Sequence, residues 1–97
     1  MKFVQIVEFR TSDIDAIRKL GEEYEAEMGD DATGVGVVCA DRDNPGRYLI
    51  IGTFDDYESA MKNSEDPRTQ ALAAAMAKIA DGPATFTNLD VIDEFGS

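Results

Sequence analysis

Apolar residues recur at every second position in four stretches of the chain, which is the period of a β-strand. The four stretches are residues 3–10, 34–41, 48–54 and 85–92. The first and third are apolar on both alternating faces, as is typical of central strands that are covered on both sides. The second contains Gly34 and Gly36, and glycine weakens a strand, so we expect this strand at an edge or with a bulge.

A helical period of three or four residues replaces the alternation after the first strand. The apolar positions there form a single stripe: Ile14, Ile17, Leu20, Tyr24 and Met28. Ser12, with Asp15 three residues later, approximates a capping box at the start of this helix. Gly29 is expected to end it, because glycine is the usual residue just beyond a helix C-terminus.

The second helical segment is predicted to be split in two. Asp55 is the expected N-cap of a short first part, with Glu58 at the capping-box position. Asp66 and Pro67 restart the helix, since aspartate caps a helix and proline is tolerated in its first turn. We expect residues 81–83, Asp-Gly-Pro, to stop it.

The predicted elements follow the order strand, helix, strand, turn, strand, helix, strand, with Asn-Pro-Gly-Arg at 44–47 as the turn. This βαββαβ order predicts one α+β, ferredoxin-like domain over residues 1–97, with an antiparallel four-stranded sheet and its helices on one face. The other face would then expose apolar side chains, which is a liability in a monomer. We therefore expect a homodimer in which a second copy covers this free face.

Composition excludes several kinds of chemistry. The sequence has no histidine and no tryptophan, so Ser-His and Cys-His nucleophiles, histidine-ligated haem and most zinc sites are ruled out within it. Its 9 basic and 20 acidic residues give a formal charge of −11, which disfavours nucleic acid and anionic membranes as partners. Acidic pairs such as Asp41 and Asp43 lack the spacing of a calcium loop, so no metal site is expected.

The cellular setting is predicted from three features. Cys39 is the only cysteine, which fits a reducing compartment. No apolar run is long enough to cross a bilayer, and residues 3–7 are typical of a strand rather than of a leader segment. We expect a cytoplasmic protein with no membrane partner.

A longer pattern begins at residues 47–60, where an aromatic strand end is followed by a Tyr-Glu-Ser-Ala helix start. Pro67 and the segment 81–86, with Gly-Pro before the last strand, extend it. In these features nearly the whole chain resembles the antibiotic-biosynthesis-monooxygenase-like group of the dimeric α+β barrel superfamily. The resemblance implies a homodimer whose two sheets pack face to face, with a small pocket between the helices and the sheet of each subunit.

Activities differ among proteins of this kind. Some oxidise phenolic or anthrone-type substrates without metal or flavin, and others degrade haem, isomerise small acids or only bind ligands. Histidine-dependent haem chemistry is not available to this chain, so we expect no cofactor.

Two amides interrupt apolar strands. Gln5 lies in the first strand and Asn88 in the last. A buried amide needs partners, so each is a candidate for ligand binding. The alternative, which is the commoner arrangement, is that they pair with each other, with the backbone or with water.

Tyr48, Tyr57 and Arg47 cluster near the third strand and the helix after it. A phenol beside an arginine is able to bind or deprotonate an acidic phenolic substrate, so the two tyrosines are the catalytic candidates and Arg47 a ligand-binding one. The alternative is that the two rings only pack in the core and that the arginine lies in a solvated turn.

Apolar candidates for an adaptable pocket are Phe54, Met61 and Met76, joined by Leu72. The alternative is plain core, because apolar residues at these spacings normally fill it.

Three hypotheses about function follow. The first is a cofactor-free oxygenase-like enzyme that acts on a small aromatic or polyketide-like substrate. The second is a non-catalytic dimer that binds a small apolar or aromatic ligand in the same pocket, or serves as an accessory subunit. The third is a structural dimer with a filled interior. Whether the chain is an enzyme is left open by the sequence.

Overall fold

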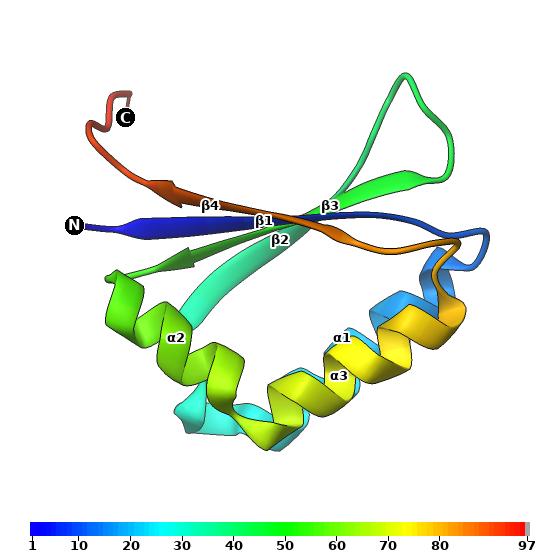
Figure 1. The fold of residues 1–97 in the computed structure, drawn as a ribbon, viewed down its shortest axis with the longest axis horizontal. Coiled ribbons are helices and arrows are strands. Elements are labelled where there is room, and N and C mark those ends of the chain that lie inside the picture. The colour runs from blue at the N-terminus through cyan, green and yellow to red at the C-terminus, as the bar shows by residue number, and fades with distance from the viewer. Residues whose placement is uncertain (97) are drawn as a thin grey trace.

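The computed structural model describes residues 1–96. Its elements follow the predicted order, with the second helical segment split as expected (Figure 1). The strands are β1 (Phe3–Arg10), β2 (Gly34–Ala40), β3 (Arg47–Phe54) and β4 (Thr85–Asp90). The helices are α1 (Ile14–Met28), the short 3₁₀ turn η1 (Gly29–Asp31), α2 (Tyr57–Glu65) and α3 (Pro67–Ile79).

The four strands form one antiparallel sheet in the order β2-β3-β1-β4. β1 and β3 are the central pair and β2 is an edge, as the sequence predicts. All three helices lie on the same side of the sheet (Figure 1). The α+β, ferredoxin-like prediction is therefore confirmed. The last strand is shorter than predicted and ends at Asp90, although the Val91 amide still donates to the Lys2 carbonyl at 2.9 Å.

Two helix starts lie one residue later than the sequence predicts. Asp13, not Ser12, is the N-cap of α1, and its carboxylate accepts from the Ala16 amide at 3.2 Å. Asp56, not Asp55, caps α2 and accepts from the Ser59 amide at 2.7 Å. In each case two neighbouring polar residues are able to cap, and the chain uses the one adjoining the first helical residue.

The break between α2 and α3 lies at Asp66, as predicted. Its backbone is extended (φ −64°, ψ 128°) because a residue that precedes proline is disfavoured in the helical region. The Asp66 carboxylate accepts from the Arg68 amide at 2.9 Å and so caps α3. At the end of α1, Gly29 has a φ of +52°, which glycine adopts without a steric cost.

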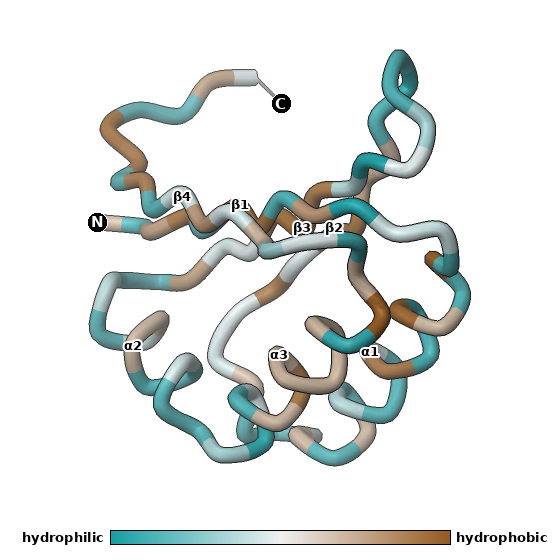
Figure 2. Tube along the Cα trace, turned by 45° about the vertical axis from the view of Figure 1, so that its right-hand side comes forward, coloured by the Kyte–Doolittle hydropathy of each residue, from teal (hydrophilic) through white to brown (hydrophobic). Residues whose placement is uncertain are grey.

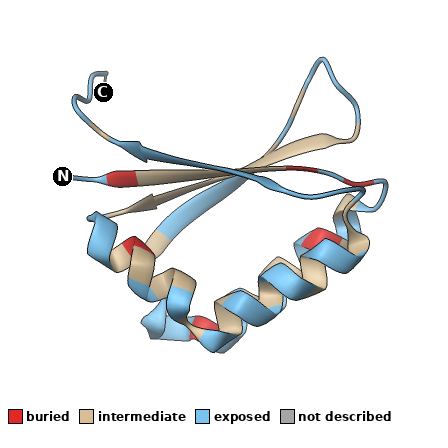
Figure 3. Cartoon of the chain, in the orientation of Figure 1, coloured by how far each residue is buried: buried red, intermediate tan, exposed pale blue. Residues whose placement is uncertain are grey.

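The core lies between the helices and the sheet. Its buried residues are Phe3 and Phe9 from β1, Ile17 and Met28 from α1 and Ala60 from α2 (Figure 3). Hydrophobic segments occur in the sheet, in α1 and α3, and also in the chain that follows β4 (Figure 2). No helix within residues 1–96 is both long and apolar enough to span a bilayer.

The sheet side away from the helices is also apolar. Because side chains alternate along a strand and paired residues share a face, the register assigns its members. We call this surface the free sheet face; its apolar residues are Val4, Ile6, Val35, Val37, Leu49, Ile51 and Leu89. Val35 and Val37, on the edge strand, are 77% and 57% exposed.

Candidate functional site

A cavity of about 270 Å³ lies between the helices and the sheet. The sheet forms its floor with Gln5, Val7, Phe9, Ile50, Gly52, Phe54 and Phe86. The helices form its roof with Tyr24, Asn63, Thr69, Leu72, Ala73, Met76 and Ala77. The connection from α3 to β4 closes one side with Ala80, Gly82, Pro83 and Ala84. The volume is near the lower end of the roughly 300–1,000 Å³ that is typical of small-molecule sites.

The cavity carries no charge. Among residues 1–96, none of those that line it is acidic or basic. Its polar members are Gln5 from β1, Tyr24 from α1, Asn63 from α2 and Thr69 from α3. An ionised ligand would leave its charge unpaired in these surroundings, at a large desolvation cost, so the site suits a ligand that is uncharged when it binds.

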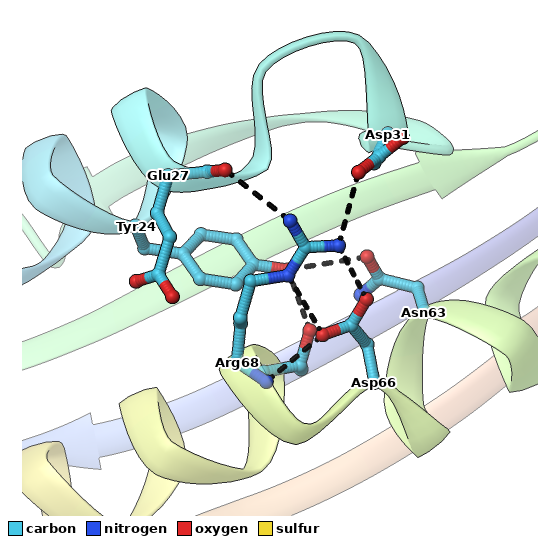
Figure 4. Close-up of polar contacts among 7 residues, drawn as sticks. Tyr24, Glu27, Asp31, Asn63, Asp66 and Arg68 are labelled. Atoms are coloured by element: carbon cyan, nitrogen blue, oxygen red, sulfur yellow. Dashed lines mark hydrogen bonds and ion pairs between the residues drawn. The ribbon is translucent and has the colours of Figure 1, made fainter.

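Three of these polar residues form one hydrogen-bonded cluster (Figure 4). The Tyr24 hydroxyl donates to the Asn63 Oδ1 at 3.2 Å and lies 2.7 Å from the Thr69 Oγ1. A phenol has a single proton, so Thr69 is the donor in the second bond. The Asn63 Nδ2 donates to no protein acceptor among residues 1–96.

An arginine holds the helices around this cluster. The Arg68 guanidinium binds Asp66 at 2.8 Å, Asp31 of η1 at 3.2 Å and the Glu27 carbonyl at 3.2 Å (Figure 4). Asp66 has a pKa lowered to about 2, chiefly by the Arg68 side chain and then by the Arg68 amide. Because Thr69 follows Arg68 directly, these bonds fix the start of α3 against the end of α1, next to the Tyr24 hydroxyl.

The two predicted amides pair with each other. The Gln5 Nε2 donates to the Asn88 Oδ1 at 3.1 Å, which is the internal pairing that the sequence offered as the commoner arrangement. Gln5 lines the cavity, and Asn88 is an exposed residue of the edge strand β4. The side-chain atoms Gln5 Oε1 and Asn88 Nδ2 have no protein partner among residues 1–96.

The predicted apolar and aromatic residues separate into two groups. Phe54 and Met76 line the cavity, whereas Met61 is half-buried in α2 and outside its lining. Tyr48 stacks on Phe9 with ring centroids 5.8 Å apart, also outside the lining. Tyr57 meets the ring of Phe3 edge-on at 5.4 Å and is 55% exposed.

Arg47 lies on the opposite side of the sheet from the cavity. It is bound by the carboxylates of Glu8 and Asp41 at the hairpin end of the free sheet face. The Asp43 amide first, then the guanidinium of Arg47, lower the pKa of Asp41 to about 2. The structure therefore does not bring Arg47 together with Tyr48 and Tyr57 as a single group around the cavity.

Tyr24, Asn63 and Thr69 were not singled out from the sequence as functional. Tyr24 belongs to the apolar stripe predicted for its helix, and a hydroxyl at such an inner position is the signal that the sequence carries. Asn63 carried no such signal. Their convergence depends on how three helices pack.

No group of three or more His, Cys, Asp or Glu is placed to hold a metal ion within residues 1–96. No protein-family model matches this sequence, and no curated protein matches it either.

Solved structures do match the fold. A protein from Nitrosomonas europaea, provisionally described as an antibiotic biosynthesis monooxygenase, is 12% identical, with a TM-score of 0.79 over 98% of this chain and 94% of that one. A Caulobacter crescentus protein with the same provisional description is 14% identical, with a TM-score of 0.81 over 95% and 91%. SnoaB, a cofactor-independent oxygenase from Streptomyces nogalater, is 11% identical, with a TM-score of 0.81 over 99% and 98%. The chain thus has the fold of antibiotic biosynthesis monooxygenase proteins.

Proposed function

We propose that the cavity is a binding site for a small, uncharged aromatic or polyketide-like molecule, which the protein oxidises with O₂ and without a cofactor. The observation that carries the proposal is an uncharged, largely apolar cavity with the Tyr24–Asn63–Thr69 cluster in its roof. The fold shared with a cofactor-independent oxygenase supports it. We retain Gln5, Phe54 and Met76 as ligand contacts, since all three line the cavity.

The reaction needs no added reductant. In an anthrone, for example, the methylene carbon loses two hydrogens and gains one oxygen atom, and the second atom of O₂ leaves as water with those two hydrogens. The substrate is oxidised and O₂ is reduced. The free amide of Asn63 would donate to the substrate oxygen and stabilise the negative charge that forms on it when the substrate loses a proton.

Oxygen uptake tests this function. The purified protein is mixed with anthrone or with hydroquinone, oxygen consumption is followed, and the product is identified by mass spectrometry. We expect uptake above the rate of the uncatalysed control and, with anthrone, one oxygen atom from ¹⁸O₂ in the product. Because no charged base lines the cavity, the bound substrate must lose its proton to solvent, so the rate should rise with pH as long as the free substrate stays uncharged. An uptake equal to the control with both compounds contradicts the oxygenase proposal.

The second candidate is a non-catalytic ligand-binding dimer. The absence of a charged general base among the cavity-lining residues favours it. A compound that raises the melting temperature but is recovered unchanged would support this candidate, because a ligand that binds only the folded state stabilises it.

We further propose a homodimer in which the free sheet faces of two copies pack together. The apolar character of that face supports this assembly, since a patch of this kind is normally covered. The C-terminal segment and the β2–β3 turn both rise on this side of the sheet and flank the face (Figures 1 and 2). A cytoplasmic setting is part of the proposal, supported by the single free thiol of Cys39.

A further inference from the structure

One row of the sheet differs from its neighbours. This row contains one residue of each strand and lies on the face that points toward the helices. Across the sheet from β2 to β4 its members are Gly36, Gly52, Gln5 and Asn88. The next row consists of Val38, Ile50, Val7 and Phe86 and is wholly apolar. The first row is a strip without side chains at Gly36 and Gly52, and of its members Gly52 and Gln5 line the cavity.

Packing does not explain the glycine at 52. A Cβ atom there would meet the Phe54 ring at 3.4 Å, which is an ordinary van der Waals contact. Its φ is not positive, so the backbone does not need glycine either. Gly34 is different, because a Cβ atom there would lie 2.7 Å from the same ring. Glycine weakens the interior of a strand, and it is found where a ligand approaches the backbone closely.

Adjacent glycines of the strip line two different hollows. Gly52 lines the cavity, and Gly36 lines a wider groove of about 720 Å³ between α1 and β2. Four residues line both hollows, so the two are neighbours: Tyr24, Ile50, Leu72 and Met76. A flat molecule lying on the strip would extend from the Gln5–Asn88 pair toward β2.

We propose that Gly52 is a specificity-determining residue. Its missing side chain admits the flat face of an aromatic ring against the backbone of β3, Gly36 continues this surface, and the free polar atoms of the Gln5–Asn88 pair meet the polar edge of the ligand. This inference rests on the proposed function, in that it assumes a small uncharged ligand in the cavity. It adds that the cavity floor at Gly52 binds flat ligands more tightly than ligands of the same size that are not flat.

Two probes with one carbon skeleton test the proposal: 1-naphthol, which is flat, and decahydro-1-naphthol, which is not. Binding to the full-length protein is measured by calorimetry. We expect the wild type to prefer 1-naphthol. Gly52→Ala should lower the affinity for 1-naphthol tenfold or more and that for decahydro-1-naphthol less than twofold. Thr53→Val, one position along and on the other sheet face, is the matched control and should leave both affinities unchanged.

Melting temperatures check the premise independently of any ligand. Gly52→Ala should melt at or above the wild-type temperature, and Gly34→Ala below it. Loss of folding in Gly52→Ala would show that packing requires the glycine and would overturn the proposal. So would 1-naphthol binding within twofold of wild type in that variant. If the wild type binds neither probe, the proposed function fails together with this inference; if it binds and Gly52→Ala binds equally well, only this inference fails.

Discussion

At the scale of single residues, the Tyr24 hydroxyl is the centre of the candidate site. It gives its only proton to Asn63 and accepts one from Thr69, so three helices meet at a single oxygen atom. This arrangement leaves the amide nitrogen of Asn63 as the donor that a ligand would meet. The direction of that donor depends on the phenol, because without it the Asn63 amide has no fixed partner.

Removal of this hydroxyl should affect ligand binding more than folding. Tyr24→Phe keeps the ring but loses two hydrogen bonds, which we expect to cost about 1 kcal/mol of stability because both partners are only partly buried. Ligand affinity, or oxygen uptake where turnover is detected, should fall tenfold or more. Thermal melts and calorimetry measure the two effects.

Tyr57→Phe is the matched control. The Tyr57 ring packs on Phe3, but its hydroxyl has no protein partner among residues 1–96, so the variant should behave as wild type in both measurements. A large loss in Tyr57→Phe with little change in Tyr24→Phe would contradict this assignment and favour Tyr57, one of the two tyrosines that the sequence predicts to be catalytic.

At the scale of elements, acidic side chains set where the helices and the hairpin begin and end. Asp13, Asp56 and Asp66 each accept a backbone amide at a helix start. Asp41 accepts the amides of Asp43 and Asn44 within the β2–β3 turn. Some of the acidic residues of this chain therefore stabilise helix starts and the hairpin turn. The contribution of each to stability is measurable by substitution.

The cap of α2 is testable against its neighbour. Asp56→Ala should lower the free energy of unfolding by about 1 kcal/mol, because it leaves the Ser59 amide without its acceptor. Asp55→Ala, one residue earlier, should change it by less than about 0.5 kcal/mol, since an ordinary surface substitution has little effect. Urea unfolding of both variants measures this difference, and equal losses would show that the two aspartates share the cap.

The acid sensitivity of the fold follows from Asp41 and Asp66. Both have pKa values lowered to about 2 in the folded protein, against 3.8 for the free side chain. Depressed carboxyl pKa values contribute stability that is fully present above pH 4 and is lost as the pH falls toward 2. The melting temperature should therefore drop over this interval.

Asp66→Asn isolates the charge, because asparagine also caps helices. Combined with Asp41→Asn, it should make the fall in melting temperature between pH 4 and pH 2 smaller than in the wild type. Asp15→Asn, on the exposed side of α1, is the control. Melts that run parallel for the double variant and the wild type would contradict this assignment.

At the scale of the whole molecule, the two faces of the sheet differ in what covers them. One holds the cavity beneath the helices, and the other exposes the apolar residues of the free sheet face. At the hairpin end of the free face, Glu8, Arg47 and Asp41 form a charged group. Two copies that pack through the apolar end would bury little unpaired charge, which favours one relative orientation.

The dimer is tested by a charge placed on the free face. Ile6→Lys should convert a two-chain mass into a one-chain mass in native mass spectrometry, because a lysine in that interface would be buried without a partner. Ile50→Lys, on the cavity side of β3, should instead lower the melting temperature through the core. A wild-type native mass in Ile6→Lys would contradict the proposed assembly.

The sequence alone determined the fold class, the element order, the central and edge strands and the break at Asp66. These features rest on local rules: side chains alternate in strands, repeat every three or four positions in helices, and proline restricts the residue before it. Local rules did not choose between neighbouring caps, as Ser12 against Asp13 and Asp55 against Asp56 show, because both members of each pair are able to accept the same kind of bond.

Only the tertiary structure decided which side chains meet. Tyr24 is 39 residues from Asn63 and 45 from Thr69, so their contact depends on the packing of three helices rather than on any spacing in the chain. Arg47 and Tyr48 are adjacent in sequence but lie on opposite faces of the sheet, because consecutive residues of a strand point in opposite directions. The family resemblance implied a small aromatic substrate, whereas the uncharged cavity and its polar cluster are visible only in the tertiary structure.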